Sequence, residues 1–144
     1  MMGNRKINAY QKESIKSRLA GANPYTIIQM LMQGALERLA KGKGCIERND
    51  LEGKAEHLSK ASSIIFALAD SLDYEVGGEV ANNLGGLYEY MNVRITDASV
   101  EKSTEPLVEV MKLMLEIKSG WDSIPPAEVE KSLALQQKKG LATP

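Results

Sequence analysis

The 144-residue sequence has little cysteine and little histidine, with one of each at Cys45 and His57. One cysteine excludes an internal disulfide, and a lone thiol is typical of a reducing compartment, so we expect a cytoplasmic protein. One cysteine and one histidine are also too few for a zinc site, and the two Glu-x-x-His motifs of a di-metal helical bundle are absent. The sequence therefore predicts no metal, no cofactor and no catalytic residues.

Charge of one sign and long apolar runs are missing as well. The formal net charge is −1, so the chain as a whole has no electrostatic field that would favour nucleic acid. Its uninterrupted apolar runs extend over only a few residues, whereas a membrane-spanning helix needs about 20. No apolar core of a secretory signal follows the polar first residues. We expect neither nucleic-acid binding nor membrane insertion.

The composition and the apolar spacing both favour helices. Aromatic residues make up 5% of the chain, while hydrophobic residues make up 43% and include many methionines. Apolar residues recur at steps of three, four or seven over residues 24–47, 51–72, 80–98 and 105–124. Short loops cannot return across the ~30 Å length of such helices, which excludes parallel neighbours. The predicted fold is therefore all-α, an antiparallel up-down four-helix bundle.

Several predicted helix ends carry recognisable signals. Asn23 is a good N-cap, and Pro24 suits the first helical position. Asn49, with Glu52 three residues later, resembles a capping box at the start of the second helix. Residues 73–78 are expected to connect the second helix to the third.

The chain is expected to have three parts. Residues 1–22 form an N-terminal arm, residues 23–124 the bundle, and residues 125–144 a C-terminal tail. Two consecutive prolines begin the tail and end the fourth helix. A weaker apolar pattern over residues 127–139 predicts a short terminal helix.

The predicted helices carry more apolar residues than one buried face each can hold. Met30 and Met32 are two positions apart, so in a helix they cannot both point into the core. The fourth helix has the same excess between Val110 and Leu115. The excess predicts an exposed, methionine-containing surface that is suited to a helical partner.

A pair of glycines, Gly85 and Gly86, lies inside the third predicted helix. Each costs up to about 1 kcal/mol relative to alanine, so the pair needs a reason. One reason is the close approach of another helix, because glycine lets backbones come nearer. The alternative is a tolerated weak point, and the sequence leaves both open.

Two other functions remain as alternatives. A histidine phosphotransfer domain is also a four-helix bundle with an exposed helical histidine, and Lys60 lies three residues after His57. However, Ala61 stands where such domains have a glycine, so the match is poor. The other alternative is a structural bundle that only self-associates.

The segment from Gly77 to Met91 is the most distinctive in the chain, because a glycine turn opens directly into an apolar and aromatic helix. It follows other motifs in a fixed order: Ala9-Tyr10-Gln11, Asn23-Pro24-Tyr25 and Ser71-Leu72-Asp73. Together, over roughly residues 8–124, these motifs resemble FliS, the flagellin-specific export chaperone family of bacteria.

The resemblance implies a helical bundle without catalytic groups that binds the disordered C-terminal segment of flagellin. The family wraps this segment along the bundle, prevents premature polymerisation, and delivers the subunit to the type III flagellar export gate. It also implies that the N-terminal segment covers part of the groove when the partner is absent. The sequence leaves open whether the free protein is a homodimer.

The expected partner-binding residues follow from the resemblance and the apolar excess. Ile7 and Tyr10 are expected to act as a displaceable lid, and Tyr25 to anchor the start of the first helix near it. Asn83 and Arg94 are eleven residues apart and share a helix face, so we expect them to make polar contacts to the partner. The expected groove wall consists of Leu68, Leu72, Leu84, Leu87, Tyr88 and Met91.

Overall fold

The computed structural model describes the backbone of residues 23–142 and the side chains of residues 23–135. This part of the chain contains helices and no strands, which confirms the all-α prediction. The helices are α2 (Pro24–Glu47), α3 (Leu51–Asp70), α4 (Tyr74–Glu101), α5 (Glu105–Asp122) and α6 (Pro126–Ala142).

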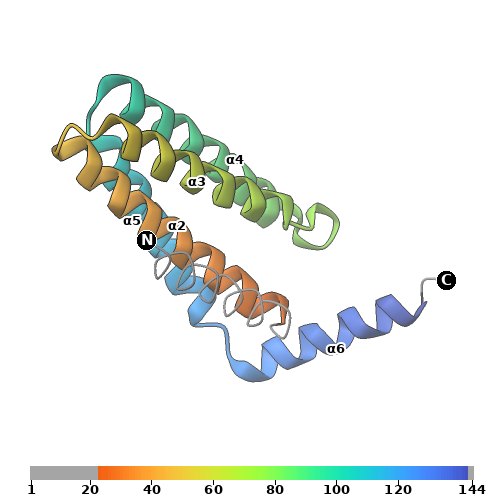
Figure 1. Cartoon of the computed structure of the whole chain (residues 1–144). Coiled ribbons are helices and arrows are strands. Elements are labelled where there is room, and N and C mark those ends of the chain that lie inside the picture. The colour runs from red at the N-terminus through yellow and green to blue at the C-terminus, as the bar shows by residue number, and fades with distance from the viewer. Residues whose placement is uncertain (1–22, 143–144) are drawn as a thin grey trace, which may run out of the picture. The chain divides into compact units, whose positions relative to one another are not determined.

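The described chain belongs to two compact units. One unit is Gln29–Ser123, and it contains most of α2 together with α3, α4 and α5. Its helices run up and down in turn, with α3 packed on α4 and α4 packed on α5 (Figure 1). In the second unit, the described residues are 23–28 and 124–142, which include the first turn of α2 and all of α6.

Most predicted helix boundaries hold within two residues. The first helix begins at Pro24, where the Asn23 side chain accepts a hydrogen bond from the Thr26 amide at 2.8 Å. It ends at Glu47 as expected. The helix after the two prolines was expected over residues 127–139 and is longer, at Pro126–Ala142.

The capping residue of α3 differs from the prediction. Asp50, and not Asn49, is the N-cap, and its carboxylate accepts a hydrogen bond from the Gly53 amide at 2.9 Å. Asn49 instead has a φ of 57°. Asparagine tolerates this left-handed conformation better than most residues. Asn49 therefore forms the turn before α3, and the next residue, Asp50, becomes the cap.

The start of α4 also corrects the prediction, because residues 73–78 are not a plain connection. Asp73 caps a helical turn by accepting hydrogen bonds from the amides of Glu75 and Val76, both at 3.1 Å. Gly78 then interrupts the helix with a φ of 51° and a ψ of −125°. Only glycine adopts these angles readily, so the chain can turn sharply here before the main part of α4 begins.

The core consists mainly of aliphatic and methionine side chains, together with Cys45 and Tyr88. Met32 is buried and Met30 only half-buried, as the two-residue spacing requires. In α4 the buried series begins at Ala81, whereas Val80, which opens the predicted apolar stripe, is 67% exposed. The largest fully buried side chains are Met32, Leu39, Ile65, Leu68, Met91, Leu107, Val110 and Met114.

Candidate functional site

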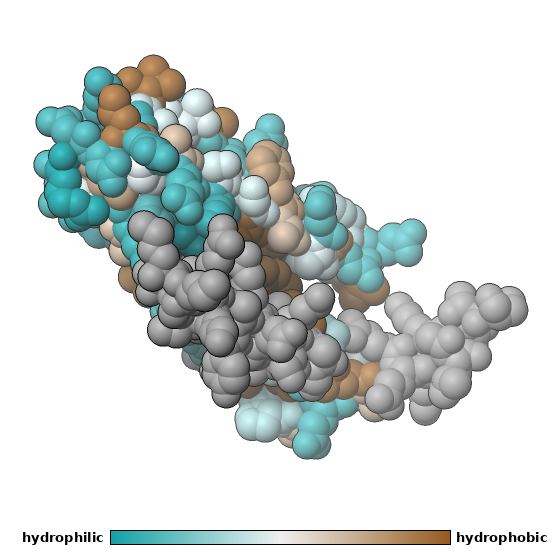
Figure 2. All heavy atoms as spheres, in the orientation of Figure 1, coloured by the Kyte–Doolittle hydropathy of each residue, from teal (hydrophilic) through white to brown (hydrophobic). Residues whose placement is uncertain are grey.

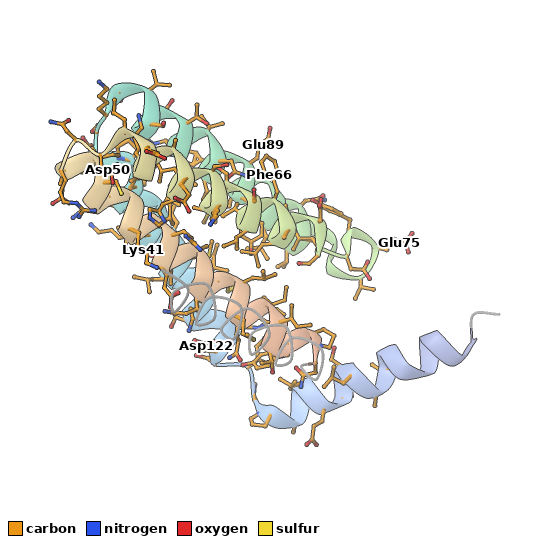
Figure 3. The ribbon with its side chains drawn as sticks, viewed as in Figure 1. Lys41, Asp50, Phe66, Glu75, Glu89 and Asp122 are labelled. Carbon is orange, nitrogen blue, oxygen red and sulfur yellow. The ribbon has the colours of Figure 1, made fainter. Side chains whose placement is uncertain are left out.

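A shallow open groove of about 510 Å³ runs between α3 and α4 on their outer side. Figure 3 shows two of its residues, Phe66 of α3 and Glu89 of α4, next to each other across the two helices. The full lining is Phe66, Ala69, Gly85, Tyr88, Glu89, Asn92, Val93 and Thr96.

The spacing of these residues explains why they form one surface. On α4 they fall at positions 85, 88, 89, 92, 93 and 96, which is one side of a helix over three turns. Gly85 and Thr96 are small and leave the floor low. Phe66 and Val93 are 60% and 55% exposed and stand at the edges of the groove. The result is a partly apolar channel. No residue of the described chain covers its large side chains.

Apolar side chains are also exposed outside the groove, so the surface of the bundle is far from uniformly charged. Figure 2 shows brown apolar spheres among pale and teal ones over α3 and α4. Brown spheres also gather at the end of the bundle where α4 ends and α3 begins. Leu51, the first residue of α3, and Val100, near the end of α4, are both exposed there.

Tyr74 lies against Gly85, a lining residue at one end of the groove. A Cβ atom on Gly85 would lie 2.6 Å from the Tyr74 hydroxyl oxygen and 3.6 Å from Leu72 Cδ1. The break at Gly78 makes this contact possible, because residues 74 and 85 would be roughly 16 Å apart along an uninterrupted helix. A Cβ on Gly86 would meet nothing within 4 Å. The two glycines therefore differ: Gly85 allows a close approach by a tyrosine, not by another helix, and Gly86 faces open space.

Asn92 places an unsatisfied acceptor in the groove. Its side-chain oxygen Oδ1 is buried and accepts no hydrogen bond within the described part of the chain. Leaving such a group unpaired costs about 1–3 kcal/mol, so buried acceptors normally have partners. The groove thus contains one polar position that the bundle itself does not satisfy.

On the opposite side of α4, polar side chains form hydrogen bonds to α5. The Tyr90 hydroxyl and Arg94 Nε both donate to Glu109 Oε1, at 2.6 and 3.0 Å. Arg94 also forms an ion pair with Asp97 at 3.1 Å. We call these four residues the α4–α5 polar seam.

The seam shifts the pKa values of its members in the expected directions. The hydrogen bond from Tyr90, together with that from Arg94, lowers the pKa of Glu109 below its usual 4.5. The same hydrogen bond to Glu109 raises the pKa of Tyr90 above 10.0. Hydrogen bonding to Glu109 and then to Asp97 raises the pKa of Arg94, so its guanidinium stays charged.

The predicted binding residues fall into distinct environments. Ile7 and Tyr10 lie outside the described residues. Asn83 is exposed, while Arg94 belongs to the polar seam and already has partners on its own helix and on α5. Of the predicted wall, Leu68, Tyr88 and Met91 are buried, and Leu72, Leu84 and Leu87, like Tyr25 in the first turn of α2, are half-buried.

Of the predicted residues, only Tyr88 lines the groove, and burial raises its pKa. Sequence reasoning missed Phe66, Asn92 and Val93. Phe66 is the only phenylalanine in the chain. It is one of several apolar residues of α3, and only the burial of its neighbours Ile65 and Leu68 shows that it lies on the outer face.

His57 is half-buried and lies beside α2. Its Nδ1 is 3.0 Å from a guanidinium nitrogen of Arg38, which can only donate. A phosphotransfer domain needs a freely exposed histidine, so nothing in this contact favours that alternative.

None of the helices between residues 24 and 142 has the length and apolar character that crossing a membrane requires. Within the same part of the chain, no three histidine, cysteine, aspartate or glutamate side chains are grouped as metal ligands.

The comparison with protein-family models matches residues 6–128 to the family described as flagellar protein FliS. The chain belongs to the FliS family. This match covers the whole Gln29–Ser123 unit, which includes the groove and the polar seam.

Curated FliS proteins from several bacteria are similar to the chain over most of their length. The flagellar secretion chaperone FliSB of Pseudomonas aeruginosa is 49% identical over 115 residues, which cover 80% of this chain and 91% of the relative. The flagellar secretion chaperone FliS of Vibrio cholerae is 43% identical over 120 residues, covering 83% and 88%. That of Salmonella typhimurium is 38% identical over 121 residues, covering 83% and 90%. These relatives identify the family as one of flagellar secretion chaperones.

Proposed function

We propose that this FliS protein binds the disordered C-terminal segment of flagellin in the cytoplasm and keeps it from polymerising before export. The bound segment forms helices along the bundle, and the chaperone presents the subunit to the type III flagellar export gate. The protein carries out no enzymatic reaction and uses no cofactor. The observation that carries the proposal is the uncovered apolar groove between α3 and α4.

The chemistry of the groove suits such a client. A disordered segment loses conformational entropy when it orders, so it needs a long and largely apolar track in return. Phe66 and Val93 supply exposed apolar walls, and Ala69 and Gly85 leave the floor open. Amphipathic helices dock in grooves of this kind through apolar residues three and four positions apart. The ordering cost also keeps the affinity moderate, which allows release for export.

The parts of the chain then have separate roles. The arm of residues 1–22 acts as a lid through Ile7 and Tyr10, the bundle of residues 23–124 binds the client, and residues 125–144 form a tail. Tyr25 lies at the start of the bundle where the arm joins it. Without client, the same apolar surface can support a homodimer, so client binding competes with self-association.

The test is a calorimetric titration of the full chain with a peptide of the flagellin C-terminal segment. We expect one-to-one binding at or below the micromolar range, with a negative heat-capacity change from apolar burial. A Tyr10→Ala variant is expected to bind more tightly because the lid is weakened. Absence of binding at about 100 μM would refute the chaperone assignment.

A further inference from the structure

We propose that the groove between α3 and α4 selects a cationic amphipathic helix: one that carries lysine or arginine beside its apolar face and presents a hydrogen-bond donor to Asn92. The inference deepens the proposed function, on which it relies for naming flagellin as the source of the helix. It assigns the groove a preference of charge and of hydrogen bonding, in addition to its apolar character.

The charge preference follows from an uneven distribution of charge along the chain. Between Lys60 and Arg94 there is no lysine or arginine. The same stretch, which contains every residue that lines the groove except Thr96, carries five carboxylates. They are Asp70, Asp73, Glu75, Glu79 and Glu89.

These carboxylates are exposed and form no ion pair with any residue of the described chain. Glu89 lines the groove itself, and Asp70 follows the lining residue Ala69 on α3. Figure 3 shows Glu75 at the end of the bundle, next to the turn that brings Tyr74 over Gly85. An apolar channel with Glu89 in its lining and Asp70 beside it, an acidic rim that no ion pair of the described chain neutralises, complements a helix that has basic residues beside its apolar stripe.

The second preference comes from Asn92. Its Oδ1 is buried in the groove and lacks a donor. Oδ1 is already buried away from water, so it gains a partner only if the Asn92 amide turns toward a donor on the docking helix. A helix that offers only apolar atoms at this position forgoes that gain. A helix with a serine, glutamine, asparagine or lysine at the facing position would supply the donor. The requirement distinguishes one amphipathic helix from another of equal hydrophobicity.

The dimensions of the site limit the length of the contact. The lining residues of α4 run from Gly85 to Thr96, a stretch of roughly 16 Å at 1.5 Å per residue. Tyr74 lies against Gly85 at one end of this stretch. The selected segment is therefore about three helical turns long, with apolar residues on one face and a donor between them.

The experiment measures binding of the flagellin C-terminal peptide to the full chain and its variants by calorimetry. A Glu89→Gln, Asp70→Asn double variant removes two rim charges and leaves the shape almost unchanged. We expect it to bind roughly two- to tenfold more weakly at low salt, with the difference closing near 1 M salt, where the Debye length is about 3 Å. Glu116→Gln is the matched control, because Glu116 is an exposed carboxylate on α5 outside the groove.

An Asn92→Leu variant tests the second preference separately. We expect about fivefold weaker binding, the value of one net hydrogen bond, and no fall in melting temperature, because the bundle loses an unpaired acceptor. A lower melting temperature with unchanged affinity would refute the role of Asn92 in selection.

Two designed helical peptides with the same apolar face, one flanked by lysines and one by glutamates, separate this inference from the proposed function. Preference of the wild-type chain for the lysine-flanked peptide supports the inference even if the flagellin peptide does not bind, a result that would refute only the flagellin assignment. Equal binding of both designed peptides overturns it. So does a flagellin peptide that binds wild type and the double variant equally well, although the proposed function then stands.

Two further outcomes would assign the groove to another occupant and overturn the proposal. Residues 1–22 contain five basic residues and a single acidic one. If the double variant binds the flagellin peptide more tightly than wild type, the rim charges hold the arm, which the proposed function already makes a lid, and not the client, so the charge preference for the client is overturned. If instead the double variant loses a dimer that wild type forms in sedimentation, the groove holds a second copy.

Discussion

The two sides of α4 are built on opposite principles. Toward α5, Tyr90 and Arg94 converge on one carboxylate oxygen of Glu109, so the polar groups of the seam have partners within the bundle. On the outer side, next to α3, Asn92 has a buried oxygen without a donor, and Val93 is left exposed. A surface that is already satisfied offers a partner little, whereas this one gains from a partner that covers its apolar groups and donates to its unpaired oxygen. We therefore expect a client helix to bind on the outer side of α4.

The contacts of Arg94 within the bundle also change the role that we expect for it. Its spacing from Asn83 led us to expect a polar contact to the partner. The structure engages its guanidinium with Glu109 and Asp97, so recruiting it for a client would first require breaking these ion pairs. We therefore expect the polar selection to come from Asn92 on the groove side.

The largest expected effects are on stability, and they distinguish a core residue, Leu68, from a groove residue, Phe66, two positions away on α3. Leu68 is 1% exposed, so Leu68→Ala is expected to lower the free energy of unfolding by about 2–5 kcal/mol. Phe66 is 60% exposed, so Phe66→Ala is expected to change it by only about 0.5 kcal/mol while weakening flagellin binding. Urea denaturation and calorimetry measure the two quantities. A large stability loss in Phe66→Ala would make Phe66 a core residue and remove one wall of the groove.

The glycine pair gives the next largest effect. Gly86→Ala is expected to stabilise the protein by about 0.5–1 kcal/mol, because it gains helix propensity and its Cβ meets nothing within 4 Å. Gly85→Ala is expected to gain less, because its Cβ would have to displace the Tyr74 hydroxyl. Thermal unfolding of both variants tests the difference. Equal gains would show that Tyr74 does not rest on Gly85 in solution.

A smaller effect is expected in the polar seam. Tyr90→Phe removes the 2.6 Å hydrogen bond to Glu109 and keeps the ring. Because these groups are exposed to solvent, we expect a slight loss of stability, well below that of Leu68→Ala, and no change in flagellin affinity. A clear loss of affinity at unchanged stability would move the client to the α5 side of α4.

The smallest effect is a dependence of stability on pH. The pKa of Glu109 is lower in the folded protein than the usual 4.5, so the folded state favours its ionised form. Its contribution to stability is therefore present above about pH 4.5 and is lost as the pH falls through the lowered pKa. Comparing unfolding curves of wild type and Glu109→Gln between neutral and acidic pH measures this contribution. A difference that grows as the pH falls would contradict the prediction.

Local signals in the sequence were enough for most helix boundaries, and they failed where two neighbouring residues could do the same task. Asn23 and Pro24 mark the start of α2 unambiguously, because the Asn23 side chain accepts a hydrogen bond and Pro24 has no N–H that needs an acceptor. Asn49 and Asp50 are both good caps, and the choice between them depends on which one takes the left-handed turn. In the structure Asn49 takes that turn, and the Asp50 amide donates to the Cys45 carbonyl at 2.8 Å.

The binding surface was less predictable than the fold. The apolar excess was visible as Met30 beside Met32, and the motif around Gly77 indicated the family. The residues that line the groove could not be separated from core residues by periodicity, because α4 is apolar on more than one face. Leu68 and Met91 were expected in the groove wall and are buried, whereas Phe66 and Asn92 were not expected there.

The sequence by itself determined that this FliS protein is an all-α bundle with more apolar surface than it can bury, because helical periodicity and composition act within each helix. Tertiary structure alone decided which apolar residues remain uncovered. Tyr74 reaches Gly85 only because the chain turns at Gly78, and Asn92 lines a groove only because α3 lies against α4. Both depend on contacts between residues far apart along a helix or on different helices, and the apolar pattern of one helix carries no information about such contacts.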